Sequence, residues 1–184
     1  MEHRQNNIRT VTGIFLDPFI IKPEQVNIED IAHALSMIAR ANGHLNSFFS
    51  VAQHSLNCAA EAKSRGLSQK VQLACLLHDA SECYIADVPR PVKHRLQGYE
   101  QIERQVMSAV FDAFGLSGMT EDELEHVWSI DDAMLYYEFE ALAGERIRNK
   151  APYISMEHDF SEKRIRDVKA KFIKTFYELY NSIS

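Results

Sequence analysis

The chain has 184 residues, of which 46% are hydrophobic and 25% charged. These are ordinary values for one globular domain, and they exclude wholesale disorder. The formal net charge of −6 argues against a nucleic-acid polymer as partner, although a small phosphorylated ligand needs only a few local cations. No run approaches the 18 apolar residues of a membrane helix, and three cysteines without metal-type spacing fit a reducing compartment. We therefore expect a cytoplasmic protein without a membrane partner.

The spacing of apolar, capping and helix-breaking residues predicts a mostly helical chain. Only seven Gly and five Pro occur, and the tracts 24–88 and 92–151 contain no proline. The expected elements begin with a short strand over 8–15, a helix from Asn27 to about Asn42, and helices over 50–64 and 68–77. A stiff extended loop at Pro89 and Pro91 follows, and then a helix over 96–114, a helical segment capped at Thr120 and a helix over 128–143. The chain ends with an irregular segment over 153–159, which would pair with the first strand, and a helix over 165–183. The sequence thus predicts one all-α domain over 1–184. We expect a bundle of about six to eight helices with a small β-ribbon near the N-terminus.

Polar residues interrupt three of the apolar helices. His54 lies within the helix over 50–64, His78 and Asp79 end the most apolar helix, and Asp131 and Asp132 stand between apolar residues further along. A buried carboxylate costs several kcal/mol unless a partner compensates its charge, and one divalent cation compensates several carboxylates at once. Imidazole and carboxylate ligands suit Mn, Fe, Co, Ni or Zn. For any single histidine, the alternative is a hydrogen-bonded core residue.

Residues 76–93 read LLHDASECYIADVPRPVK, and SVAQHS precedes them at 50–55. This pattern resembles the HD-domain phosphohydrolases and is most similar to their bacterial 5′-deoxynucleotidase branch, over roughly 31–142. The resemblance implies a helical HD domain that binds one divalent ion, with Mg as a further candidate, and hydrolyses a phosphate ester of a nucleoside. The family pattern H…HD…D assigns the metal to His54, His78, Asp79 and Asp132. Asp132 is preferred to Asp131 because the family aspartate is followed by Ala and apolar residues, a choice that helical periodicity leaves open.

Two further carboxylates follow the His-Asp pair. Glu82 lies one turn beyond His78 and Asp79, where it can position the water that a metal activates or manage its proton. Asp87, before the proline loop, can donate to the leaving oxygen or hold a sugar hydroxyl. The alternatives are a helix-end surface carboxylate for Glu82 and a plain loop residue for Asp87.

Phosphate requires cations or amide donors. The resemblance places an arginine in the substrate pocket at the position of Arg40, and His44 lies near it across Gly43. Lys93 follows the proline loop and can reach a phosphate, although a solvated surface lysine is the default for such a position. His158 is expected on the surface.

These observations favour a metal-dependent phosphohydrolase that acts on nucleoside or deoxynucleoside 5′-monophosphates. The alternatives are an HD phosphodiesterase, a triphosphohydrolase, a guanosine tetraphosphate hydrolase, and, from another class, a non-catalytic nucleotide-binding HD module. If Arg90, Lys93 and Arg95 face solvent, the pocket fits a monophosphate best, because a triphosphate needs several cations. The resemblance also suggests a homodimer.

Overall fold

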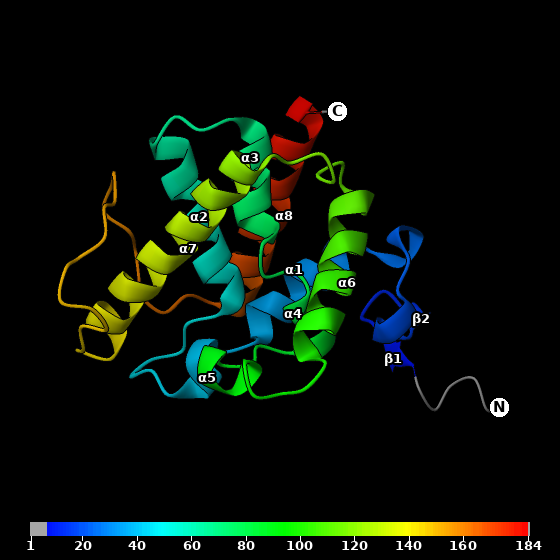
Figure 1. Ribbon diagram of the computed structural model, residues 1–184, viewed down its shortest axis with the longest axis horizontal. Coiled ribbons are helices and arrows are strands. Elements are labelled where there is room, and N and C mark those ends of the chain that lie inside the picture. The colour runs from blue at the N-terminus through cyan, green and yellow to red at the C-terminus, as the bar shows by residue number, and fades with distance from the viewer. Residues whose placement is uncertain (1–6, 184) are drawn as a thin grey trace.

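The computed structural model describes residues 7–183, and most of these residues form helices (Figure 1). The helices are α1 Ile28–Met37, α2 Val51–Ser64, α3 Gln69–Leu77, α4 Glu82–Ile85, α5 Arg90–Lys93, α6 Tyr99–Ala113, α7 Glu121–Leu142 and α8 Ile165–Ile183. The strands β1 Ile8–Arg9 and β2 Phe15–Leu16 pair antiparallel. The predicted all-α bundle with a small ribbon near the N-terminus is confirmed.

Several helices begin where capping residues predict them to begin. In each case a hydroxyl oxygen accepts from the backbone N–H three residues further on, which satisfies a donor that the first helical turn leaves without a partner. The capping residues are Ser50 for α2, Ser68 for α3 and Thr120 for α7. The starts of the helices that carry the candidate site are therefore specified locally.

The first helix is shorter than predicted. It ends at Met37 rather than near Asn42, because the chain turns extended at Ile38. The backbone N–H of Arg40 donates to the carbonyl oxygen of Phe49 at 2.8 Å, in an antiparallel bridge to the segment before α2. Arg40 consequently lies in a separate 3-10 turn, Arg40–Gly43, rather than in the last turn of α1.

Two other predicted boundaries are wrong. The helical segments expected after Thr120 and over 128–143 are one helix, α7, since no glycine or proline interrupts it. The proline loop is not fully extended. It forms the single turn α5, in whose first turn Pro91 stands, and a proline fits there because that turn lacks intrahelical N–H partners.

The second strand also differs from the prediction. It is formed by residues 15–16, so that the ribbon is a local hairpin with β1. Residues 153–159 are irregular, as expected, but they pair with no strand in the described chain.

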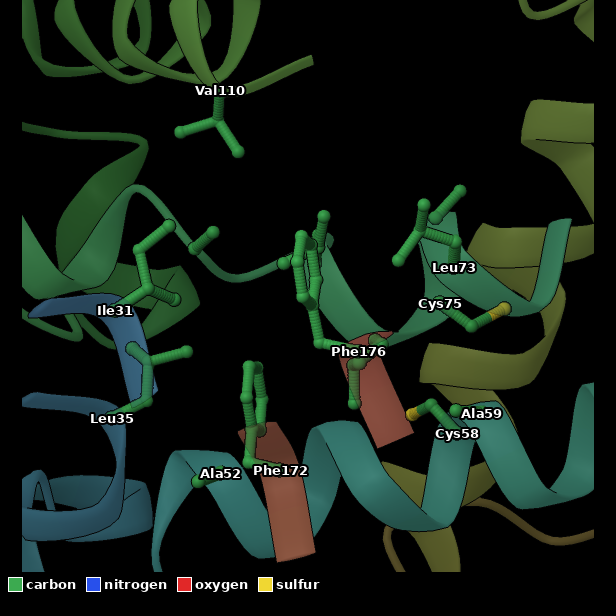
Figure 2. Packing of buried hydrophobic residues seen from close by; sticks show 14 of the residues in the cluster. Ile31, Leu35, Ala52, Cys58, Ala59, Leu73, Cys75, Val110, Phe172 and Phe176 are labelled. Atoms are coloured by element: carbon green, nitrogen blue, oxygen red, sulfur yellow. The ribbon is translucent and has the colours of Figure 1, made fainter. Parts of the chain in front are cut away.

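The core lies where α8 packs against α1, α2 and α3 (Figure 1). Phe172 and Phe176 of α8 are fully buried, and Figure 2 shows them among side chains of the other three helices, such as Leu35, Cys58 and Cys75. This packing fixes α2 and α3 side by side, with α7 packed against both. Within residues 7–183, no helix is long and apolar enough to cross a membrane.

A buried carboxylate ties residues 153–161 to α2. Glu61 accepts from Arg65 Nε at 2.8 Å and from the backbone N–H of Ser155 at 2.7 Å, and its second oxygen lies 2.9 Å from His158 Nε2. The His158 side chain is only 1% exposed, so its predicted surface position is wrong. Burial alone would raise the pKa of Glu61, but the hydrogen bonds from Arg65, His158 and Ser155 hold that pKa below its usual value.

This lowered pKa predicts an acid-dependent stability. A depressed carboxyl pKa stabilises the fold above the unfolded pKa of about 4.3, and the contribution is lost as the pH falls through the folded pKa. We expect Glu61→Gln to cost about 2 kcal/mol at pH 7, with a difference from the wild type that shrinks below about pH 4. Denaturant unfolding of metal-free protein between pH 3 and pH 7 measures it. A difference that does not change with pH would show that the charge of Glu61 contributes nothing.

Candidate metal centre

Three helices bring four ionisable side chains together. His54 lies in α2, His78 and Asp79 follow α3, and Asp131 lies in α7. The Nε2 atoms of His54 and His78 are 3.1 Å apart. Asp131 Oδ1 lies 3.1 Å from His54 Nε2 and 3.7 Å from His78 Nε2. Asp79 Oδ2 lies 3.7 Å from His54 Nε2 and 3.3 Å from His78 Nε2. Two imidazole nitrogens and two carboxylate oxygens thus converge on one point.

The hydrogen bonds of the two Nδ1 atoms determine whether each Nε2 atom carries a proton or a lone pair. His78 Nδ1 lies 2.8 Å from the carbonyl oxygen of Cys75, and because a carbonyl can only accept, Nδ1 carries the proton. His54 Nδ1 lies 2.5 Å from a carboxylate oxygen of Glu138, to which it donates in the same way. In the neutral imidazoles, both Nε2 lone pairs then face each other at 3.1 Å. Such a pair requires a cation between them, and a carboxylate behind a histidine is a common support of metal ligands.

The electrostatics of the cluster agree with this requirement. Burial alone would lower the pKa values of His54 and His78, yet the neighbouring carboxylates raise both. Burial alone would raise the pKa values of Asp79 and Asp131, yet the histidines hold both below their usual range. The cluster therefore calls for positive charge, which either protons on the imidazoles or a divalent ion can supply.

The residues present fit a divalent ion. Nitrogen and oxygen donors held about 2.1 Å from one such ion lie roughly 3.0–3.5 Å apart, close to the distances of 3.1–3.7 Å found here. The donor set suits first-row ions such as Mn, Fe, Co, Ni or Zn.

A cysteine also borders the cluster. Cys58 Sγ lies 3.5 Å from His54 Nε2, and the ligand atoms of His54, Cys58 and His78 all lie within 4.8 Å of one another, so that this group could hold a metal ion. Burial raises the pKa of the Cys58 thiol well above its usual value. Since a thiol ligates a metal only as thiolate, Cys58 would have to release its proton on binding, whereas the carboxylates of Asp79 and Asp131 would not.

The fourth ligand expected from the sequence is not in this cluster. Asp132 Oδ1 accepts from Arg90 at 3.0 Å and its Oδ2 accepts from Arg148 at 2.9 Å. Adjacent residues on a helix point about 100° apart, so only one of the two aspartates can face α2 and α3. That residue is Asp131, so the structure places the predicted ligand Asp132 outside the cluster and its neighbour Asp131 inside it.

Glu138 is a further member of the site that the sequence pattern did not indicate. It lies two turns beyond Asp131 on the same face of α7, is 1% exposed, and contacts His54 Nδ1 with Oε1. Its Oε2 accepts from Arg40 Nε at 3.3 Å, and Arg40 Nη1 donates to Asp79 Oδ2 at 3.4 Å. Arg40, predicted as a phosphate-binding residue, thus contacts two carboxylates at the cluster.

A cavity of about 550 Å³ opens beside the cluster, and both predicted catalytic carboxylates line it. Glu82 is 4% exposed, and its Oε2 has no hydrogen-bond partner among the described residues. Burial raises the pKa of Glu82 well above its usual value, and the nearby carboxylates of Asp79 and Asp87 raise it further. Burial and Asp79 also raise the pKa of Asp87. A carboxyl group that binds a proton readily is suited to general acid–base work.

Two of the three predicted substrate-binding residues line the cavity. Arg40 and Lys93 line the cavity, whereas His44 is exposed and is not among the described residues that line it. Lys93 Nζ lies 2.5 Å from Glu103 Oε1. Arg90 lines the cavity too although its side chain is 52% exposed, and Arg95 is exposed outside the cavity. Of the three cations named for the monophosphate argument, only Arg95 therefore lies away from the cavity.

Comparison with known proteins identifies the family. A family model described as HD domain matches residues 39–160, about two thirds of the chain. The chain therefore belongs to the HD-domain family, a family of metal-dependent phosphohydrolases that bind divalent metals. The matched range contains all four converging side chains.

Two relatives extend this comparison. The chain is 36% identical over 109 residues to the uncharacterized protein YfdR of Escherichia coli K12, across 59% of this chain and 58% of that protein. It is 34% identical over 143 residues to an uncharacterized protein of Rhodobacter capsulatus, across 74% of this chain and 72% of the relative. The chain thus spans less than two thirds of the length of YfdR.

Proposed function

We propose that this chain is a phosphomonoesterase that hydrolyses nucleoside or deoxynucleoside 5′-monophosphates, as in the 5′-deoxynucleotidase branch. The observation that carries the proposal is the charge of the cavity beside the candidate metal centre. Among the described residues, seven carboxylates but only four Lys and Arg side chains line it. The lysine and the arginines already contact carboxylates. One divalent ion leaves little positive charge to spare, which favours one phosphoryl group over a polyphosphate chain.

The residues divide the chemical work. His54, His78, Asp79 and Asp131 would hold the ion, which when bound lowers the pKa of a water ligand and withdraws charge from phosphoryl oxygens. Glu82, with its unpartnered Oε2, accepts the proton of the attacking water. Asp87, whose pKa is raised by burial and by Asp79, donates to the leaving sugar oxygen or holds a sugar hydroxyl.

The apolar part of the cavity lining supports a nucleoside. Leu45, Leu135, Phe139 and Ile147 line the cavity together with the proline loop. A mostly apolar lining with a few converging polar groups is the usual composition of a small-molecule site. A base and sugar can pack against these apolar side chains while the phosphate reaches Arg40 and the bound ion.

A substrate panel tests the proposal. Phosphate release from dAMP, AMP, dATP and guanosine tetraphosphate, and cleavage of bis(p-nitrophenyl) phosphate, are measured with Mn²⁺, Co²⁺ and Mg²⁺. We expect the monophosphates to give the highest kcat/KM. Faster hydrolysis of dATP would favour a triphosphohydrolase, and faster cleavage of the diester would favour a phosphodiesterase. Nucleotide binding without turnover would favour the non-catalytic module.

Arg40→Lys tests how the phosphate is held. A planar guanidinium can bind phosphate oxygens while it stays bonded to Glu138 and Asp79, which a lysine ammonium cannot reproduce. We expect kcat/KM on dAMP to fall about tenfold to a hundredfold, with metal content unchanged. Arg146→Lys is the control, because Arg146 is 73% exposed and contacts only Glu140 among its recorded ion pairs. Equal activity of the two variants would remove Arg40 from the substrate site.

A further inference from the structure

The two oxygens of Asp131 face different partners. Oδ1 lies 3.1 Å from His54 Nε2, inside the candidate metal centre. Oδ2 accepts from Nη2 of Arg90 at 3.4 Å. Arg90 lies in α5, between Pro89 and Pro91, so a residue far away in the sequence contacts the outer side of a proposed ligand.

Arg90 is itself held in place by a chain of ion pairs. Its Nη1 donates to Asp132 Oδ1 at 3.0 Å, and Asp132 Oδ2 accepts from Arg148 Nη2 at 2.9 Å. Arg148 belongs to the irregular segment that follows α7. The guanidinium of Arg90 thus spans two adjacent carboxylates of α7, and Asp132 joins an arginine of α5 to an arginine of the segment that follows α7.

Stability alone does not explain this arrangement. The Arg90 and Arg148 side chains are 52% and 43% exposed, and an exposed ion pair typically contributes less than about 1 kcal/mol. A guanidinium that grips two carboxylates, however, fixes the rotation of both. A carboxylate can offer a metal one oxygen or two, and the hydrogen bonds behind a ligand decide which of these it offers.

We propose that Arg90 is a positioning residue for the metal centre. It holds Oδ2 of Asp131, so that this carboxylate presents Oδ1 alone to the divalent ion, and Asp132 with Arg148 holds Arg90 in place. This inference rests on the proposed metal centre. In this arrangement Asp132 acts on the metal centre indirectly, because it holds Arg90, which in turn holds the ligand Asp131.

The affinity for Mn²⁺ alone tests this role, because charge and position predict opposite results. Removing a cation beside a metal ligand would, by charge alone, tighten metal binding. Loss of a supporting contact typically weakens it about 10- to 100-fold. In titration calorimetry of metal-free protein, we expect Arg90→Ala to weaken Mn²⁺ binding by about tenfold or more. Unchanged or tighter binding would overturn the inference.

A double-mutant cycle tests the link to Asp132. We expect Asp132→Asn to weaken Mn²⁺ binding by less than Arg90→Ala does, and to add little to it in the double variant, because both changes act through one contact. Full additivity would contradict the link. Arg146→Ala is the control, and thermal melts of the metal-free variants report whether the fold is intact.

The outcomes separate this inference from the proposal on which it rests. If the wild type takes up no Mn²⁺, Co²⁺ or Zn²⁺, the metal centre fails and the role of Arg90 fails with it. If the wild type binds Mn²⁺ and Arg90→Ala binds it equally well, only the role of Arg90 is overturned. An increase in KM for dAMP with unchanged Mn²⁺ affinity would make Arg90 a phosphate-binding residue instead.

Discussion

A Glu82→Gln variant is expected to keep its divalent ion and to lose turnover by about a hundredfold or more. Transfer of a proton by a positioned side chain contributes about 10²- to 10⁴-fold. Glutamine keeps the shape of the side chain but cannot accept the proton. Because Glu82 Oε2 has no partner in the described chain and lines the cavity, the substitution breaks no recorded hydrogen bond. The measurements are kcat on dAMP and metal content by elemental analysis.

Glu100→Gln is the matched control for this variant. Glu100 also lines the cavity, but its side chain is 48% exposed and contacts His94 and Arg104 rather than the metal cluster. We expect its turnover to stay within about twofold of the wild type, since no general acid–base step involves it. Loss of metal together with activity in Glu82→Gln would make Glu82 a ligand. An unchanged rate would return it to the role of a buried structural carboxyl.

The helices that carry the site could be predicted because local signals specify them. Serine caps and 3.6-residue apolar periodicity place α2 and α3, and they place His54 on a buried face of α2 and His78 directly after the buried helix α3. The end of α1 could not be predicted in this way. It depends on the bridge between Ala39 and Ser50, a pairing between segments that no local propensity encodes.

The choice of ligands on α7 shows a second limit. Asp131 and Asp132 both have apolar neighbours, so their local pattern is the same, and only the packing of α7 against α2 and α3 decides which one faces the histidines. One signal was present in the sequence. Glu138 lies seven residues after Asp131, and two acidic residues at that spacing share one helix face. Such spacing is common on solvent-exposed helix faces. It therefore indicates a functional pair only when the helix face that carries Asp131 and Glu138 is known to be buried.

The largest expected effect on metal binding separates these two aspartates. In Asp131→Ala, the cluster loses a carboxylate that lies 3.1 Å from His54 Nε2, and we expect Mn²⁺ affinity to fall by a hundredfold or more, on the order of the loss of one ligand. In Asp132→Ala, the metal-facing oxygen of Asp131 remains, and we expect a loss of at most about tenfold, transmitted through Arg90. His78→Ala serves as a second ligand variant and should behave like Asp131→Ala. Titration calorimetry with Mn²⁺ and elemental analysis of protein purified without chelator measure all three. If Asp132→Ala lost the metal while Asp131→Ala kept it, the sequence-based assignment would be restored, and α7 would have to present its other aspartate to α2 and α3.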